Sequence, residues 1–178
     1  MNVFPILHKY LDEHPGLYDI VCHHSMKVAE KSLEIARNHP ELGADRTFLE
    51  EAALLHDIGV FMANAPKISC FGPAPYICHG YLGREILDLE DMPKHGLVCE
   101  RHIGTGLTVA EIERLKLPLP HRDMSPVTIE EQIICFADLF YSKGAPGIEK
   151  TVEAVRSNIE KYGTEGLIRF DNWCNRFL

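Results

Sequence analysis

The amino-acid sequence predicts an all-α protein folded as a single-domain helical bundle. Apolar residues recur at three- and four-residue spacing in several segments, which is the period of one face of a helix. Helix-start patterns of the form S/T-x-x-E lead into three of these segments, whereas runs that alternate apolar and polar residues, as strands do, are not apparent. A length of 178 residues fits one ordinary domain, and we expect residues 1–178 to form it.

Five helices are expected in the first part of the chain. The second of them carries an inward apolar stripe with three-four spacing, formed by Leu17, Val21, His24, Val28 and Ile35. The third begins at a capping box of Thr47 with Glu50 and ends before Gly59. The fifth ends before two glycines that follow His102. The predicted ranges are 3–12, 17–38, 47–58, 79–90 and 92–103.

Four more helices are expected in the second part. Capping boxes of Thr108 with Glu111 and of Thr128 with Glu131 start two of these helices. Glycines lie where helices are expected to end. The predicted ranges are 108–115, 128–142, 147–162 and 164–177.

The segment 60–78 is the one long stretch without a helical signal, and it is rich in Pro, Gly and Ala. A loop of this length inside a compact domain is more often functional than idle, so we expect it to border a binding site. The aromatic residues Phe61, Phe71 and Tyr76, together with Tyr141, are candidates to stack on a nucleobase.

The composition indicates which kinds of partner and which cellular location to expect for the protein. Hydrophobic residues make up 46% of the chain and charged residues 25%, as in soluble globular proteins. No apolar stretch approaches the roughly 20 residues that span a bilayer, and no leader peptide is evident, so we expect a cytoplasmic protein without a membrane partner. The net charge of −8 disfavours binding to nucleic acid.

The six cysteines form no C-x-x-C pair and are expected to be reduced thiols. Homo-oligomerisation remains open.

His56 and Asp57 stand side by side at the end of an apolar helix. A buried carboxylate must be hydrogen-bonded, paired or bound to a cation. Adjacent side chains on a helix diverge by about 100°, and a metal ion between the two at the helix end is one interpretation, because imidazole nitrogen and carboxylate oxygen suit first-row divalent ions. A solvated helix end capped by Asp57 explains this dipeptide equally well.

Four further residues lie on faces that are expected to point inward. They are His24, His79, His102 and Asp138, the last being the single charge in an apolar helix. Each histidine also fits a core residue bound to a backbone carbonyl, and Asp138 also fits an ion pair with Lys143 or Arg101.

The order of these residues, H…HD…H…H…D, resembles that of the HD-domain superfamily of metal-dependent phosphohydrolases. The tetrapeptide "HDIG" at 56–59 resembles its best-known signature, and the resemblance covers roughly residues 18–143. Segments such as "HGYLGREIL" and "ERHIGTGLT" are most similar to small stand-alone bacterial and archaeal members. Residues 144–178 are then expected to be C-terminal helices of the same domain.

The resemblance implies a phosphohydrolase in which metal-activated water attacks a nucleotide or another small phosphate ester, including nucleoside polyphosphates. It implies one or two divalent first-row ions (Fe, Mn, Zn, Ni or Co), with or without Mg, as cofactor. Asp57 and His56 are the implied catalytic residues. The implied ligands are His24, His56, Asp57 and Asp138 for one ion, with His79 and His102 completing a second and Asp57 bridging. Arg101 and Lys143 are candidates for phosphate contact, and Arg84 is a weaker one.

Two other functions remain open. Some HD-fold proteins with the same ligand set are mixed-valence di-iron oxygenases, and others could be non-catalytic metal-containing modules that bind nucleotides. Many members follow HDIG with a lysine, whereas this chain has Val60. This difference weakens any transfer of a substrate from the lysine-bearing members, but it leaves the ligand set intact.

Overall fold

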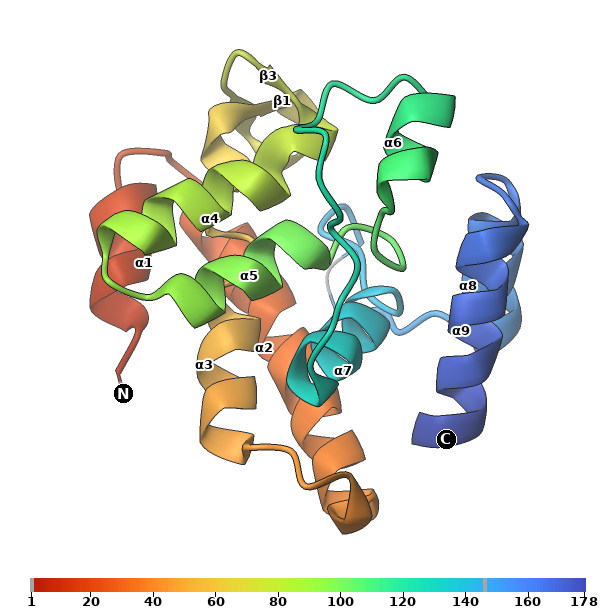
Figure 1. The fold of residues 1–178 in the computed structure, drawn as a ribbon. Coiled ribbons are helices and arrows are strands. Elements are labelled where there is room, and N and C mark those ends of the chain that lie inside the picture. The colour runs from red at the N-terminus through yellow and green to blue at the C-terminus, as the bar shows by residue number, and fades with distance from the viewer. Residues whose placement is uncertain (1, 146) are drawn as a thin grey trace.

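The computed structural model of the protein describes residues 2–145 and 147–178, and in these ranges it contains nine α-helices and one small sheet (Figure 1). The prediction of an all-α fold is confirmed. Met1 and Pro146, which the predicted domain range includes, lie outside the described residues, and the single-domain assignment stays a prediction. The helices are α1 (Phe4–Leu11), α2 (Leu17–Asn38), α3 (Arg46–Leu55), α4 (His79–Leu89), α5 (Pro93–Arg101), α6 (Val109–Arg114), α7 (Ile129–Asp138), α8 (Val152–Glu160) and α9 (Thr164–Phe177).

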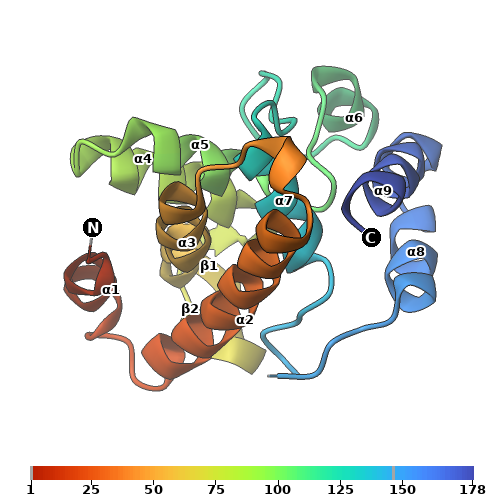
Figure 2. The same ribbon diagram turned by 90° about the horizontal axis from the view of Figure 1, so that it is seen from below.

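Helix α7 lies between the long helix α2 and the C-terminal pair α8 and α9, which run side by side (Figure 2). The ring of Phe136 on α7 is fully buried and lies 5.7 Å from the ring of Phe170 and 5.4 Å from that of Phe177, centroid to centroid. Such aromatic pairs add to the free energy of burial of large apolar rings. The same core includes Val28 and Ile35 of α2.

A second core joins α1 to the N-terminal half of α2 and to the junction of α3 with α4. Leu7 and Leu11 of α1, Val21 of α2 and Leu55 of α3 are fully buried in it. Because Val21 belongs to this core and Val28 to the core around α7, the intervening residue His24 lies where the two cores meet. The inward stripe predicted for this helix is therefore confirmed.

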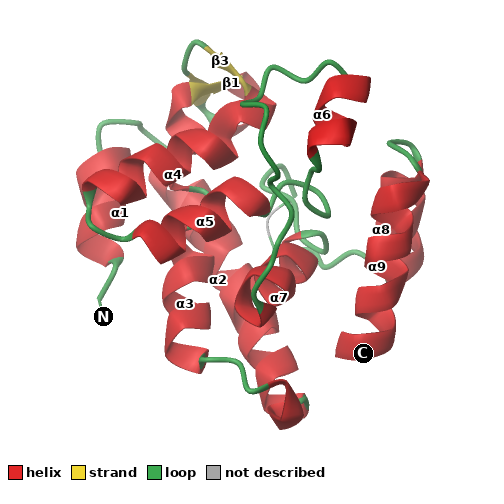
Figure 3. Ribbon diagram, in the orientation of Figure 1, coloured by secondary structure: helices red, strands yellow, loops and turns green. Residues whose placement is uncertain are grey.

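The segment 60–78 contains a small sheet that the sequence did not predict (Figure 3). The strands are β1 (Ala63–Ala65), β2 (Cys70–Phe71) and β3 (Ala74–Pro75), in the order β2-β1-β3, with β1 antiparallel to β2 and parallel to β3. The 3-10 turns Ile58–Met62, Pro66–Ile68 and Tyr76–Cys78 connect them to each other and to the helices. Strands of two or three residues are too short to show an alternating pattern.

Two of the three predicted capping boxes are confirmed, at Thr108 with Glu111 and at Thr128 with Glu131. The third, at Thr47, is wrong. The side chain of Asp45 caps α3 by accepting hydrogen bonds from the backbone N–H groups of Thr47 and Phe48, at 2.9 and 3.1 Å. Aspartate is as strong an N-cap as serine and stronger than threonine, so the helix begins one residue earlier than expected.

Helix α7 ends at Asp138, four residues before the predicted end, and α8 begins at Val152 instead of residue 147. The ammonium of Lys150 donates to the carbonyls of Leu139 and Tyr141, both at 3.0 Å, and so satisfies acceptors that the end of the helix leaves free. Asp138 therefore lies at the C-terminal end of α7. The chain after the helix turns back, so that Lys143 reaches Asp57.

None of the helices among the described residues combines the length and the apolar character needed to cross a membrane. The six cysteines are free, and five of them are buried.

Gly59, in the 3-10 turn Ile58–Met62 that follows α3, packs directly against the backbone of α4. A methyl group added at its Cα would lie 2.3 Å from the backbone nitrogen of Gly83 and 2.4 Å from the carbonyl oxygen of His79. Neither backbone atom can move without shifting α4, so we expect Gly59→Ala to lower the free energy of unfolding by roughly 3 kcal/mol. Urea unfolding followed by circular dichroism measures the change.

Gly144→Ala is the matched control, because an added methyl group there meets no atom within 4 Å. Equal stability of Gly59→Ala and the wild type would contradict the close approach of the two backbones.

Candidate metal centre

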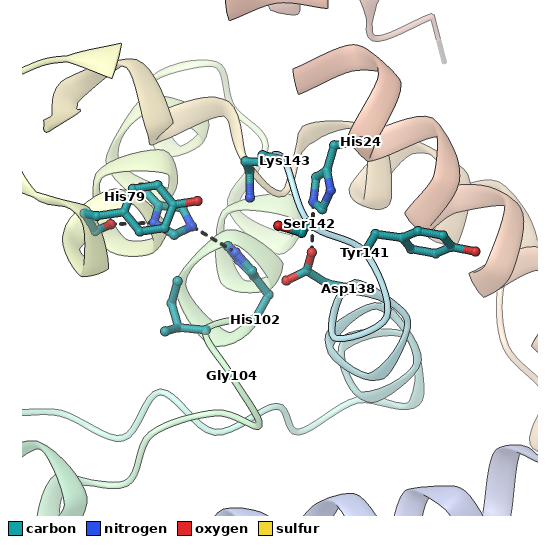
Figure 4. A pocket seen from close by; sticks show the side chains of 10 residues that line it. His24, His79, His102, Gly104, Asp138, Tyr141, Ser142 and Lys143 are labelled. Atoms are coloured by element: carbon teal, nitrogen blue, oxygen red, sulfur yellow. Dashed lines mark hydrogen bonds and ion pairs between the residues drawn. The ribbon is translucent and has the colours of Figure 1, made fainter. Parts of the chain in front are cut away.

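Six side chains from distant parts of the sequence converge where the two cores meet. His24 comes from the middle of α2, and Asp138 is the last residue of α7. His56 and His102 follow the last residues of α3 and α5, and His79 is the first residue of α4. The four histidines and Asp57 are buried, each at most 4% exposed. Helix ends thus supply most of the cluster, and Figure 4 shows His24 beside Asp138 and His79 beside His102.

The carboxylate of Asp57 lies between two groups of histidines. Its Oδ2 atom is 3.2 Å from Nε2 of His24 and 3.1 Å from Nε2 of His56. Its Oδ1 atom is 3.2 Å from Nε2 of His79 and 3.6 Å from Nε2 of His102. Each oxygen therefore faces its own pair of imidazoles, which is the arrangement required of a carboxylate that bridges two cations.

Asp138 adds a second carboxylate to the first of these pairs. Its Oδ1 atom lies 2.9 Å from Nε2 of His24 and 3.6 Å from Nε2 of His56. The alternative considered for Asp138, an ion pair with Lys143 or Arg101, is not formed, because these cations pair with Asp57 and Glu131. Ligand atoms of His24, His56 and Asp138 lie within 4.8 Å of one another, and so do those of His56, Asp57 and His102.

Three of the histidines are oriented by backbone carbonyls. In each case Nδ1 lies within 2.7 Å of the carbonyl oxygen of the residue three positions earlier, at the end of a helical turn. The pairs are His56 with Ala53, His79 with Tyr76 and His102 with Cys99. An N–H on Nδ1 leaves the lone pair of a neutral imidazole on Nε2, the atom that points into the cluster, and such bonds typically support a metal-ligating histidine.

Several buried polar atoms of the cluster lack a hydrogen-bond partner. Among the described residues, these include Nδ1 of His24, Nε2 of His56 and Oδ1 of Asp57. Nε2 of His24 and Oδ2 of Asp57 instead have ion-pair contacts, with Asp138 at 2.9 Å and Lys143 at 2.6 Å. Nε2 of His79 lies 3.2 Å from Nε2 of His102, and two lone pairs at that separation need a proton or a cation between them. The nitrogen and oxygen donors together fit first-row divalent ions such as Fe, Mn or Zn. The cluster is thus compatible with binding of a divalent metal ion.

The two carboxylates hold positive charge at the site. Burial opposes ionisation of Asp57, but the charges of His56 and Lys143 hold its pKa well below the usual range. Burial likewise lowers the pKa of His56, yet the charge of Asp57 and hydrogen bonding to Asp138 raise it to about 10. Burial lowers the pKa of His102 to about 4. A proton on Nε2 of His56 and a divalent cation are therefore alternative ways to balance the same carboxylates.

The two residues predicted to contact phosphate have different surroundings. The ammonium of Lys143 lies 2.6 Å from Oδ2 of Asp57, inside the cluster. Arg101 instead forms an ion pair with Glu131, with Nη1 2.9 Å from both carboxylate oxygens. Since adjacent helical positions diverge by about 100°, Arg101 faces α7 when His102 faces the cluster. Arg101 does not line the cavity at the cluster, and its contact with phosphate stays a prediction. The weaker candidate Arg84 is held by Glu100.

A cavity of about 230 Å³ opens onto the cluster. Tyr76, Tyr141 and Lys143 line it, as do three residues that were not singled out from the sequence, Ile103, Gly104 and Ser142. Ile103 and Gly104 follow His102 directly in the sequence, and Ser142 precedes Lys143. This proximity to predicted site residues is the sequence signal by which they could have been identified. Phe61 instead packs against His14, and Phe71 is 77% exposed.

Comparison with known proteins gives one family. The HD domain family matches residues 21–142. An uncharacterized protein of Methanocaldococcus jannaschii is 36% identical over 121 residues, which are 66% of this chain and 64% of that protein. No solved structure matches the chain significantly.

Two other relatives are named tRNA (cytidine(56)-2'-O)-methyltransferase. The protein of Picrophilus torridus is 33% identical over 67% of this chain and 31% of its own length. That of Thermoplasma volcanium is 30% identical over 90% of this chain and 40% of its own length. The chain thus spans less than two thirds of each of these three relatives, and most of each methyltransferase has no counterpart in it.

Metal titration tests the two halves of the cluster separately. We expect the wild type to bind two divalent cations per chain, and saturation at a hundredfold excess over the dissociation constant to stabilise the fold by about 2.7 kcal/mol for each bound cation. The double variant His79→Ala, His102→Ala removes the pair that faces Oδ1 of Asp57, so it should bind one cation. Metal analysis after dialysis against Mn²⁺, together with thermal melting, measures both effects.

The double variant His39→Ala, His121→Ala changes two histidines outside the cluster and should retain two cations. Two cations in the variant that lacks His79 and His102 would rule out these residues as ligands.

Proposed function

Because the chain belongs to the HD domain family, we propose that it is a metal-dependent phosphohydrolase that acts on a nucleotide or another small phosphate ester. The observation that carries the proposal is the buried carboxylate of Asp57, whose two oxygens each face a separate pair of histidines beside a cavity. A carboxylate between two cation sites fits the hydrolysis of a phosphate ester by a pair of metal ions. In this proposal His24, His56, Asp57 and Asp138 hold one ion, and His79 and His102 hold the second.

The reaction transfers a phosphoryl group to water. The bond from phosphorus to the oxygen of the organic group breaks, a bond from the water oxygen to phosphorus forms, and inorganic phosphate and the alcohol leave. Bound divalent ions lower the pKa of a coordinated water towards neutrality and neutralise charge on the phosphoryl oxygens. The chain itself keeps the site in place through the carbonyls that orient His56, His79 and His102.

Lys143 is proposed to bind the phosphoryl group. Its side chain is 10% exposed and reaches the cluster from the irregular segment after α7, while it also lines the cavity. A flexible four-carbon side chain allows its ammonium to turn from Oδ2 of Asp57 to a phosphoryl oxygen at the mouth of the site. Tyr76 lies next to it, with the ammonium 5.9 Å from the ring centre.

Methyl transfer is not proposed for this chain, although two relatives carry that name. The matched part is 31% or 40% of each methyltransferase, and the family that matches this chain is the HD domain. The net charge of −8 also argues against a long nucleic acid as the substrate. The proposal is therefore a small phosphorylated molecule.

We expect Asp57→Asn to abolish phosphate release while the protein stays folded. The amide keeps the shape of the side chain but removes the charge that balances the cations, and loss of metal would lower kcat/KM by several orders of magnitude. The assay is phosphate release from a panel of mono-, di- and triphosphorylated nucleotides and simple phosphate esters in the presence of Mn²⁺. Circular dichroism establishes that the variant is folded.

Unchanged turnover by Asp57→Asn would refute the proposal. A coloured, iron-containing wild-type protein that consumes O₂ and releases no phosphate would favour an oxygenase instead. Metal binding without either reaction would favour a non-catalytic module.

Lys143→Met tests the phosphate contact. Methionine keeps the length of the side chain but cannot donate to a phosphoryl oxygen, so we expect kcat/KM to fall by about 10- to 100-fold, in keeping with the loss of one charged hydrogen bond. Lys67→Met is the matched control, because Lys67 is exposed and does not line the cavity. Equal kinetics of Lys143→Met and the wild type would contradict the assignment.

A further inference from the structure

A second, mostly apolar cavity of about 360 Å³ lies beside the metal centre. Its walls come from α6 and the chain that flanks it, from η4 (Tyr76–Cys78), and from the facing ends of α8 and α9. The aliphatic side chains that line it are Ile77, Ile103, Leu107, Leu115, Leu117 and Ile159. A concave, mainly apolar space of this size is typical of a site for a small molecule.

The apolar cavity adjoins the cavity at the metal centre. Four residues line both: Tyr76, His79, Ile103 and Gly104. A methyl group added at Gly104 would meet no atom within 4 Å, so the border between the two spaces is open at this position. In Figure 4, Gly104 lies on the chain that leaves His102, at the edge of the cluster. A molecule bound at the metal centre can therefore extend into the apolar cavity.

The linings offer little positive charge for a second phosphoryl group. Among the described residues that line either cavity, the cationic side chains other than histidine are Lys143 and Arg169. Nη2 of Arg169 lies 2.7 Å from a carboxylate oxygen of Glu111 and donates to the carbonyl of Gly106 at 2.9 Å. A second phosphoryl group in the apolar cavity would have to compete with Glu111 for this guanidinium.

Three polar residues of the apolar cavity, Arg169, Thr105 and Glu111, are held by hydrogen bonds within the protein. Nε of Arg169 donates to the carbonyl of Thr105 at 3.1 Å and to its hydroxyl at 3.3 Å. The other carboxylate oxygen of Glu111 accepts hydrogen bonds from Thr108. A nucleobase presents several donors and acceptors on its edges, and burying them without partners is unfavourable. The lining suits an uncharged group with few polar atoms better.

We infer that the substrate is a phosphomonoester whose organic part is an uncharged aryl or alkyl group, and that this group lies in the apolar cavity while the phosphoryl group lies at the metal centre. The inference rests on the proposed function and narrows it from phosphate esters in general to this class. Ile103 and Leu115 are the specificity-determining residues, because the first lines both cavities and the second lines the apolar one from the position just after α6.

The kinetic test compares 1-naphthyl phosphate, methyl phosphate, adenosine monophosphate and adenosine triphosphate on the Mn²⁺-loaded protein. Burial of an aromatic group in the cavity should favour 1-naphthyl phosphate over methyl phosphate by on the order of 100-fold in kcat/KM. Leu115→Asp places a charge at the apolar wall and should lower this ratio at least tenfold. Leu115 is 37% exposed, so the variant is expected to fold, and Leu115→Ser is a milder second variant.

Leu89→Asp is the matched control for both variants, since Leu89 is 82% exposed and lines neither cavity. It should leave the ratio unchanged. A higher kcat/KM for either adenosine nucleotide than for 1-naphthyl phosphate would overturn the inference. The inference would also be overturned if Leu115→Asp and Leu115→Ser both left the ratio of kcat/KM for 1-naphthyl phosphate to that for methyl phosphate unchanged.

A binding measurement separates failure of the inference from failure of the proposed function. Calorimetric titration with 1-naphthol, which carries no phosphate, should give saturable binding to the wild type and to Leu89→Asp, and at least tenfold weaker binding to Leu115→Asp. If 1-naphthol binds in this way but the protein releases phosphate from no ester, the apolar site is upheld and the phosphohydrolase is refuted. Phosphate release without saturable binding of 1-naphthol would uphold the phosphohydrolase and refute the apolar site.

Discussion

The buried negative charge of Asp57 is the constraint on which the rest of the site depends. A carboxylate removed from water is tolerated only where positive charge surrounds it. Here the histidines that face its two oxygens, together with Lys143, supply or accommodate that charge. The carbonyls behind three of these histidines fix their orientation, and the packing of α2, α3, α4 and α5 fixes the positions of the carbonyls.

The sequence predicted the helices well where the local signals were strong. The stripe of α2 and two capping boxes predicted their elements because each depends on side chains within a turn or two of one another. The C-terminal end of α7 and the start of α3 were predicted less well. They are decided by Lys150, which reaches back to carbonyls from beyond the helix, and by Asp45, which competes with a neighbouring threonine. The three short strands were not predicted, because segments of two or three residues are too short to show an alternating pattern.

The candidate site was predictable to the extent that it follows a family pattern. Taken singly, His56 and Asp57 allowed capping and coordination equally, and only the order of all six residues favoured a metal centre. The ion pair of Arg101 with Glu131 and the apolar cavity could not be foreseen. Both depend on how helices far apart in the chain pack together, and Arg169, which closes the cavity with Glu111, comes from the last helix.

The positions of the six inward-facing residues along the chain also decide how the site can assemble. In a calcium-binding loop, a dozen neighbouring residues supply the ligands, and a peptide of that length can bind the ion. Here His24 and Asp138 stand near opposite ends of the matched region, and they meet only through the packing of α2 against α7. No fragment that lacks α7 contains the complete cluster. Assembly of the site therefore requires that the long chain between these two helices has closed, with the entropy cost that this closure carries.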